Sequence, residues 1–221
     1  MKKIITTGLL LLSSITAFAE TPKEINAAFK VSTLGFGIDA STPINEIYSM
    51  RLNINNVSFS DTQTSDGNTY DGTLNLFTAG LLLDAYPFQN NFRLSTGVYY
   101  NDNGYTGTIT PSLTQTIEIN GINYTSTDIT KVNMDVIFDK VAPYFGIGWG
   151  NDARDKGWGF TCDLGVLYHG KGTVNLNADI NNPLIATQIN NGLIIEEQNI
   201  NNNLSDFQLY PVVSIGINRS F

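Results

Sequence analysis

The sequence predicts an all-β fold: a transmembrane up-and-down antiparallel β-barrel of eight strands, with short periplasmic turns and long extracellular loops. Three observations predict it. Several segments alternate large apolar with small or polar residues, the small face is rich in glycine, and short connections alternate with long ones. Alternation with a period of two indicates β-strands, because successive side chains of a strand point to opposite faces.

The segment 141–170 shows this alternation most clearly. Its halves are joined by the polar run NDARDK and therefore predict an antiparallel hairpin. One face carries large apolar side chains, whereas Gly, Thr and Asp dominate the other. A soluble sandwich would turn charged residues outward, but a membrane barrel turns apolar residues to lipid and small or polar ones to a narrow lumen. The apolar face consists of Val141, Pro143, Phe145, Ile147, Trp149, Trp158, Phe160, Cys162, Leu164, Val166 and Tyr168.

The N-terminus predicts a cleaved signal peptide over residues 1–19, followed by one barrel domain over 20–221. Lys2 and Lys3 precede an apolar core at 4–12, and Ala17-Phe18-Ala19 forms a small-residue cleavage pattern. The apolar core is shorter than the roughly 20 residues that a membrane-spanning helix needs. We therefore expect export through the inner membrane and residence in the bacterial outer membrane.

Charge and cysteine content exclude several classes of protein. Beyond residue 19 the chain carries 20 acidic and 10 basic side chains, a net charge of −10. Nucleic-acid binding is not expected, because phosphate contacts need clustered Lys and Arg. The single cysteine, Cys162, has no partner for an internal disulfide and is interpreted as a small apolar group facing lipid.

Seven strands can be placed from the alternation, and an even number is expected for a bacterial barrel. The eighth is expected either in 22–33 or within 102–133. In the first strand Leu34, Phe36 and Ile38 are predicted to point outward and Asp39 inward. In the second strand the apolar phase changes at Asn55-Asn56, which predicts a β-bulge there. The seven strands lie at 30–40, 47–60, 73–86, 92–101, 141–150, 157–169 and 207–221.

Three long segments, 61–72, 102–133 and 171–206, alternate with short connections. The first is predicted to be a polar loop; it lacks the closing Glu of an EF-hand calcium loop. In the second, Asn120-Gly121 between alternating apolar residues predicts a β-hairpin. In the third, apolar residues at helical spacing predict an amphipathic helix within 185–204. Exposed loops on a rigid scaffold carry recognition, so an external ligand, which the sequence does not identify, would bind there.

The runs LGFGID, DAYPFQNNFRLSTGVYYN, APYFGIGWG and the terminal YPVVSIGINRSF carry a resemblance to a known family. With them the chain resembles the small outer-membrane β-barrels of Gram-negative bacteria, of the OmpA-transmembrane-domain, OmpX and OmpW kind. The resemblance implies contact with outer-membrane lipid and lipopolysaccharide. It also implies recognition of the C-terminal strand by the barrel assembly machinery, although Arg219 stands where this family usually has an apolar residue.

Five inward charged residues are expected to meet inside the ring: Asp39, Arg51, Asp84, Arg93 and Asp163. Buried charges must be paired, so the cluster predicts either a structural network that plugs the lumen or a gate in a narrow channel. On the outer face, four aromatic residues are predicted to lie at the lipid interfaces: Trp149, Trp158, Tyr168 and Phe221.

Three functions remain open: a structural or surface-interaction protein with a largely plugged lumen, a narrow porin-like channel for small or apolar solutes, and a lipid-modifying enzyme. Enzymatic outer-membrane barrels need histidine, and the chain has one, His169, without a serine beside it. One His and one outward Cys are also a poor metal site. We therefore predict no enzyme activity, no catalytic residue, no cofactor and no metal, and favour the structural or surface-interaction role.

Overall fold

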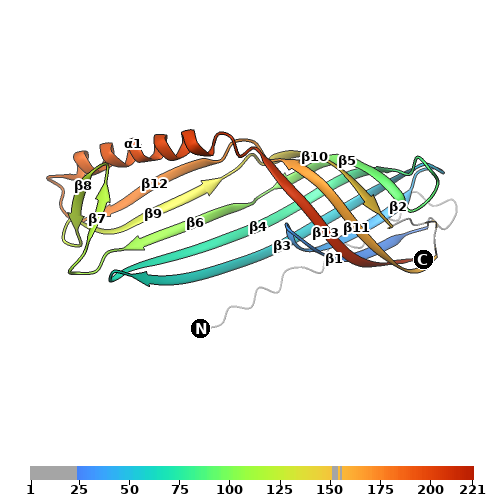
Figure 1. Cartoon of the computed structure of the whole chain (residues 1–221), viewed down its shortest axis with the longest axis horizontal. Helices are drawn as coiled ribbons and strands as arrows, with labels where there is room; N and C mark the ends of the chain where they lie inside the picture. The colour runs from blue at the N-terminus through green and yellow to red at the C-terminus, as the bar shows by residue number, and fades with distance from the viewer. Residues whose placement is uncertain (1–23, 151–153, 155) are drawn as a thin grey trace, which may run out of the picture.

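The structure is a computed structural model that describes residues 24–150, 154 and 156–221. The predicted signal peptide lies outside these residues. The described chain is mostly antiparallel β-sheet with one helix, and it is elongated, with the C-terminus near one end and α1 near the other (Figure 1). The elements are β1 (Asn26–Ser32), β2 (Gly35–Pro43), β3 (Tyr48–Ser65), β4 (Asn68–Ala85), β5 (Phe92–Asn101), β6 (Gly104–Thr110), β7 (Thr116–Ile119), β8 (Ile122–Thr125), β9 (Ile129–Ile137), β10 (Val141–Trp149), β11 (Gly157–Tyr168), β12 (Thr173–Ile180), α1 (Ala186–Leu204) and β13 (Leu209–Ser220).

Eight strands close into a ring in the order β4-β3-β2-β1-β13-β11-β10-β5, and β5 pairs again with β4. Every pairing is antiparallel. The eighth strand is β1, which lies within the predicted alternative at 22–33. The predicted first strand, 30–40, was wrong as a single element: the chain reverses at Thr33-Leu34 between β1 and β2. For this reason Leu34, predicted to face outward, lies inside the ring and is 1% exposed.

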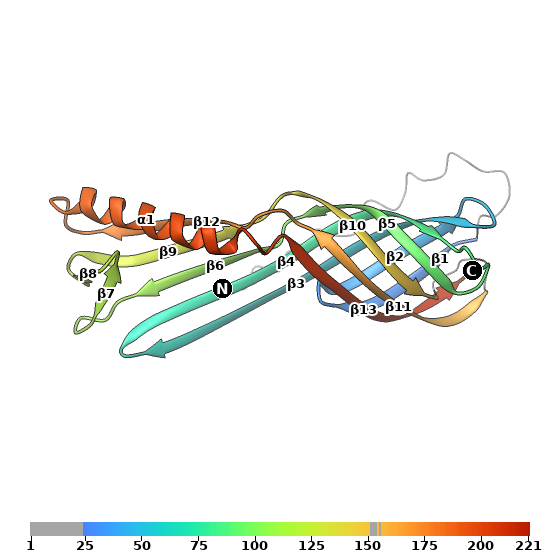
Figure 2. The ribbon, with the colours of Figure 1, turned by 45° about the horizontal axis from the view of Figure 1, so that its top comes forward.

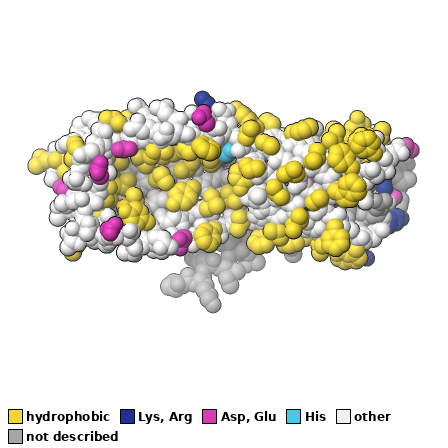
Figure 3. Space-filling view, viewed as in Figure 1, with side chains coloured by type: hydrophobic (Ala, Val, Ile, Leu, Met, Phe, Trp, Pro, Cys, Tyr) yellow, Lys and Arg dark blue, Asp and Glu magenta, His cyan; other side chains and the backbone are white. Residues whose placement is uncertain are grey.

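The ring wall is apolar outside, as the alternation predicts, and its inner face carries polar residues together with a smaller group of apolar ones. In β11, Phe160 is 83% exposed and the next residue, Thr161, is 3% exposed. The outward residues include every member of the predicted apolar face of 141–170. Hydrophobic side chains accordingly spread over the ring half of the surface, at the right of Figure 3.

β3 and β4 continue far beyond the ring and form an extension with three further strands. β6 pairs with the first part of β4, from Thr69 to Asn75, and β9 and β12 follow in order. The extension is seen at the left of Figures 1 and 2. The predicted polar loop at 61–72 was therefore wrong: these residues are strand on both sides of a two-residue turn. Asp66 and Gly67, with φ of 49° and 80°, make this turn, which suits the twist of a hairpin.

The predicted β-bulge at Asn55-Asn56 was also wrong, because β3 keeps one register with β4 from Tyr48 to Ser65. The side chains of β3 keep alternating in phase along the whole strand. What changes is the environment that each face of the strand meets. Within the ring the inward residues of β3 are polar, and beyond it the same face carries Val57 and Phe59. The opposite face becomes polar, since the side chains of Ser58 and Ser60 hydrogen-bond those of Asn75 and Thr73. Polarity is thus inverted between the two halves of the molecule.

The apolar face of the extension is partly covered by α1 and by the β7–β8 hairpin. The hairpin turns at Asn120-Gly121 and the helix spans Ala186–Leu204, so both predictions are confirmed. The helix and the hairpin enclose a second core with β9 and β12, in which Ile129 and Ile189 are 0% exposed. No helix in the described part of the chain is both long and apolar enough to cross a membrane.

α1 also protects the outer edge of the extension. On β12, the N–H of Val174 donates to the side-chain oxygen of Asn201 at 2.7 Å, and the Asn201 amide donates to the Val174 carbonyl at 3.2 Å. The N–H of Leu176 donates to Glu197 at 3.1 Å. Helix side chains therefore satisfy backbone groups that an edge strand would otherwise present for pairing with another chain.

Candidate functional site

The predicted inward charges meet inside the ring. Arg51 is 2% exposed and binds Asp84 at two points: its Nε lies 2.7 Å from Oδ2 and its Nη2 lies 2.8 Å from Oδ1. The Nη1 atom of Arg51 lies 3.2 Å from Asp39 Oδ2. Planar guanidinium groups favour such two-point contacts with carboxylates, which fix both geometry and energy. Arg51 therefore links the inner faces of β2, β3 and β4.

Asp163, on β11, joins the other side of the ring to this cluster. Its Oδ1 accepts from Arg93 Nη2 at 2.5 Å, and its Oδ2 accepts from Lys30 Nζ at 2.6 Å and from the Ser214 hydroxyl at 2.9 Å. Lys30 also pairs with Asp39. These contacts connect β1, β5, β11 and β13, so the cluster reaches across the whole lumen.

The sequence prediction missed Lys30. It lies on the eighth strand, which the alternation alone did not place. The net charge of the predicted cluster could have indicated it, because the five predicted residues carry two positive and three negative charges. A buried cluster with one excess carboxylate calls for another cation. With Lys30 added, three cations balance three carboxylates, and we call these six residues the charge network.

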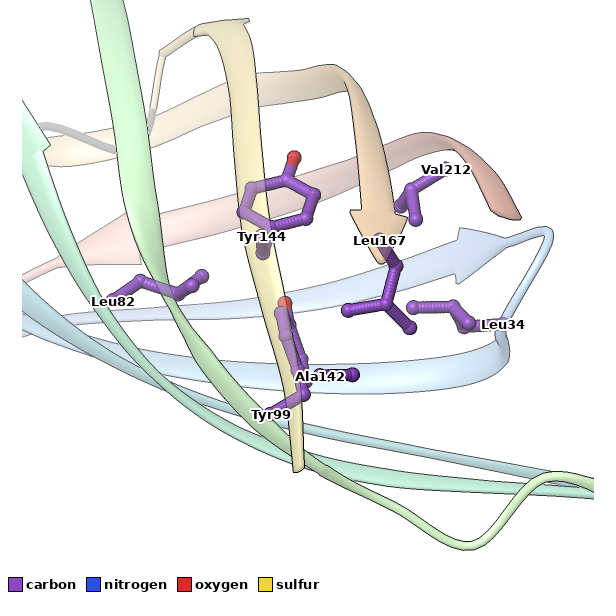
Figure 4. Close-up of a cluster of buried hydrophobic side chains, with 7 residues drawn as sticks. All are labelled: Leu34, Leu82, Tyr99, Ala142, Tyr144, Leu167 and Val212. Atoms are coloured by element: carbon purple, nitrogen blue, oxygen red, sulfur yellow. The ribbon is translucent and has the colours of Figure 1, made fainter. Parts of the chain in front are cut away.

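A layer of apolar side chains lies inside the ring between the charge network and the extension. Figure 4 shows its seven residues. Its two aromatic members, Tyr99 and Tyr144, pack edge to face with ring centres 5.6 Å apart. The layer consists of Leu34, Leu82, Tyr99, Ala142, Tyr144, Leu167 and Val212. Between it and the charge network remains a cavity of about 10 Å³, enough for a single water molecule.

The extension contains a much larger cleft, of about 520 Å³. It lies over the part of the apolar face that α1 and the β7–β8 hairpin leave open. Phe59 and Leu74, paired across β3 and β4, are 66% and 40% exposed there. In Figure 3 hydrophobic side chains are visible below α1 in the left half of the molecule. The sequence alone does not predict this cleft, because the polar residues of 61–72 predict a loop where the structure has two strands.

Tyr105 forms part of the wall of the cleft and depends on two paired glycines. Gly72 on β4 lies opposite Gly107 on β6. A Cβ atom on Gly72 would lie 2.5 Å from the Tyr105 hydroxyl, and one on Gly107 would lie 3.2 Å from its ring. Larger residues would push the aromatic ring away from the sheet, so the two glycines help to set the shape of the cleft.

His169 is buried at the junction of the ring and the extension. Its ring centre lies 4.2 Å from that of Phe138 and 5.9 Å from that of Tyr210. Burial lowers the pKa of His169, and the Asp139 carboxylate partly opposes this effect. Both aromatic contacts are packing contacts. Within the described residues, no group of three or more His, Cys, Asp or Glu is arranged to hold a metal ion.

The four predicted interface aromatics all lie on the outside of the molecule. Trp149, Trp158 and Phe221 are near the short-turn end of the ring, and Tyr168 is at the end where the extension begins. The guanidinium of Arg219 lies 5.4 Å from the Trp158 ring centre and 5.1 Å from that of Phe221. Both distances are within the range of a cation–π contact.

No protein-family model matches the sequence, and no curated protein matches it. Among the solved structures that share the fold are two from Acinetobacter baumannii. Acinetobacter baumannii CarO2 aligns with a TM-score of 0.58 and 21% identity, over 91% of this chain and 100% of that one. Acinetobacter baumannii CarO aligns with a TM-score of 0.56 and 22% identity, over 89% and 97%. The similarity thus covers most of this chain and most of each solved chain.

Proposed function

We propose that this protein is an outer-membrane β-barrel with a closed lumen, which anchors an external, ligand-accessible extension in the membrane. Its role is then structural and surface-interacting rather than conducting. The observation that carries the proposal is the inversion of polarity along β3 and β4. The fold shared with CarO and CarO2 agrees with this architecture.

The inversion supports a bilayer around the ring and water around the extension. A large contiguous apolar surface on the outside of a protein is typical of a face that lipid or another apolar surface covers. On β3 the outward residues Leu52 and Ile54 are about half exposed, whereas Ser58 and Ser60, further along the same face, bond to polar partners. We place the membrane boundary between Ile54 and Ser58.

Two layers support a closed lumen. The charge network joins strands from all sides of the ring, and the apolar layer around Tyr99 and Tyr144 fills the lumen above it. An ion or polar solute would have to break buried ion pairs and then cross the apolar side chains, and both steps cost free energy. The cavity between the two layers, of about 10 Å³, is too small for a hydrated ion.

The proposal extends to how the protein reaches the membrane. β13 ends at Ser220, one residue before the last, and turns Val213, Ile215 and Ile217 outward. This apolar face, followed by Phe221, is the feature that the assembly machinery of the outer membrane would recognise. The contacts of His169 with Phe138 and Tyr210 favour a packing role for the histidine over catalysis.

Single-channel recording in planar bilayers tests the proposal. The folded chain is expected to give no resolved current. As a control for insertion and detection, the double variant Arg51→Ser with Tyr144→Ser removes one group from each layer and is expected to conduct. A resolved current from the unaltered chain would favour the alternative, a narrow channel.

A further inference from the structure

We propose that the cleft of the extension binds a small amphiphile with an apolar body and a permanent positive charge. The proposal rests on the proposed function only for placing the cleft on the outer side of the membrane. Its argument comes from three features of the cleft: an apolar floor left without a protein cover, a size that suits a small molecule, and a rim of one charge sign.

The apolar face of the extension is covered on one side and open on the other. Over β9, Ile129 is completely buried in the core that α1 and the hairpin form, and Val174 on β12 is also completely buried. Over β3 and β4, Phe59 remains 66% exposed although it lies on the same face. Since exposed aromatic surface in water costs free energy, this strip is suited to receiving an apolar group.

The size of the cleft favours a small ligand over a protein segment. Its volume of about 520 Å³ lies within the range of roughly 300–1,000 Å³ that is usual for small-molecule sites. Met134 and Tyr105 lie at its floor and wall, and Ile200 of α1 borders it. An unbranched chain of about ten carbons with a compact head is an occupant of suitable size.

The rim selects the charge of the ligand. Among the residues that line the cleft, none is basic and four are acidic: Asp61, Asp71, Glu118 and Glu196. The Asp71 carboxylate accepts from the Thr62 hydroxyl on the opposite face of the sheet, and Glu118 alternates with the buried Ile117 and Ile119, so Asp61 and Glu196 supply the carboxylates of the cleft. Asp61 lies on the same face of β3 as Phe59, and Glu196 lies on α1 across the cleft, where it accepts from the N–H of Asn120 at 3.0 Å. Carboxylates on both walls attract a cationic head and repel a carboxylate, sulfonate or phosphate.

The methionines provide a test with an internal control. Beyond the predicted signal peptide the chain has two, Met134 in the cleft and Met50 on the outer wall of the ring. With 13C-methyl methionine in the full-length mature chain in zwitterionic phospholipid nanodiscs, Met134 reports binding in the cleft and Met50 reports partition into the bilayer. The probes are decyltrimethylammonium and decanesulfonate, both below micelle-forming concentrations.

We expect decyltrimethylammonium to shift the Met134 signal saturably and decanesulfonate to leave it unchanged. Replacing both carboxylates, Asp61→Asn with Glu196→Gln, is expected to weaken the cation roughly tenfold, since each exposed charge contributes modestly. The matched control, Asp135→Asn with Asp179→Asn, removes two carboxylates from the polar face of the extension and is expected to change the affinity less than twofold.

A third variant tests the cleft itself. Leu74 is partly exposed on the floor, so Leu74→Trp fills the cleft without disturbing the buried core and is expected to abolish the Met134 shift. The proposal is overturned if Met134 does not respond, if both probes shift it equally, or if the two double variants weaken the cation alike. None of these results bears on conduction through the ring, so this proposal and the proposed function fail separately.

Discussion

Arg51 and Asp84 form a two-point ion pair inside the ring, with Nε 2.7 Å from Oδ2 and Nη2 2.8 Å from Oδ1. Both side chains are almost fully buried. Around them, Asp39, Asp163 and Ser95 use the remaining donors of the guanidinium. The arginine therefore links carboxylates from three strands, and its removal should affect the whole ring.

Replacing Arg51 by methionine is expected to lower the free energy of unfolding by about 3–5 kcal/mol, because it leaves buried carboxylates without their partner. Urea titration in lipid vesicles, followed by tryptophan fluorescence, measures this. The control is Lys140→Met, which removes the exposed ion pair with Asp102 and should cost about 0–1 kcal/mol. Similar small losses in both variants would count against a structural role for the charge network.

Gly165 makes room for Tyr144 in the apolar layer. It pairs with Gly146 across β10 and β11, and a Cβ on Gly165 would lie 2.6 Å from the tyrosine ring. Gly165→Val is therefore expected to destabilise the fold by about 1–3 kcal/mol, although valine favours strands. The same urea titration applies. Combining it with Tyr144→Ala should recover part of the loss, and strictly additive effects would contradict the packing described here.

The contact of Asn201 with the backbone of Val174 makes a separate prediction for the edge of β12. Asn201→Leu removes two hydrogen bonds, so the Val174 amide is expected to exchange with solvent roughly fivefold faster. Hydrogen–deuterium exchange measures the change. Asn202→Leu on the exposed side of α1 serves as the control. Equal exchange at Val174 in both variants would mean that α1 does not protect this edge.

His169 predicts a dependence of stability on pH. Its pKa is lowered by burial, so in the folded state it binds protons less readily than in the unfolded chain, where its pKa is about 6.5. The unfolding free energy should therefore decrease as the pH falls through about 6.5. The unfolding free energy of the His169→Gln variant should decrease less over the same pH range. NMR titration of this single histidine in the unaltered chain should give a midpoint below 6.5. A midpoint above 6.5 would contradict the burial.

The ring was accessible to sequence reasoning because each ring strand carries apolar side chains on its outer face and mostly small or polar ones on its inner face. That contrast fixes the facing of 141–170, 92–101 and the C-terminal strand. The contrast does not place Lys30 and Leu34 correctly, because the turn between β1 and β2 has only two residues and does not appear as a polar run in the sequence. The predicted inward charges do meet, but their balance required a strand that the alternation did not reveal.

The extension was less accessible, for a physical reason. Beyond the ring, the apolar and polar faces of β3 exchange, and this exchange looks like a β-bulge when only the sequence is read. The polar residues of 61–72 resemble a loop because their strand lies in water on one face. The helix at 186–204 was predictable from its spacing, but its position against β12 depends on contacts between segments far apart in sequence.

The inversion along β3 is tested most directly by placing single tryptophans on its outward face. In a background of Trp149→Phe and Trp158→Phe, Ile54→Trp and Ser58→Trp lie on the same face, four residues apart. In vesicles of lipids brominated along the acyl chain, we expect strong fluorescence quenching at position 54 and little at position 58. Equal quenching at both positions, or stronger quenching at 58, would contradict a membrane boundary between them.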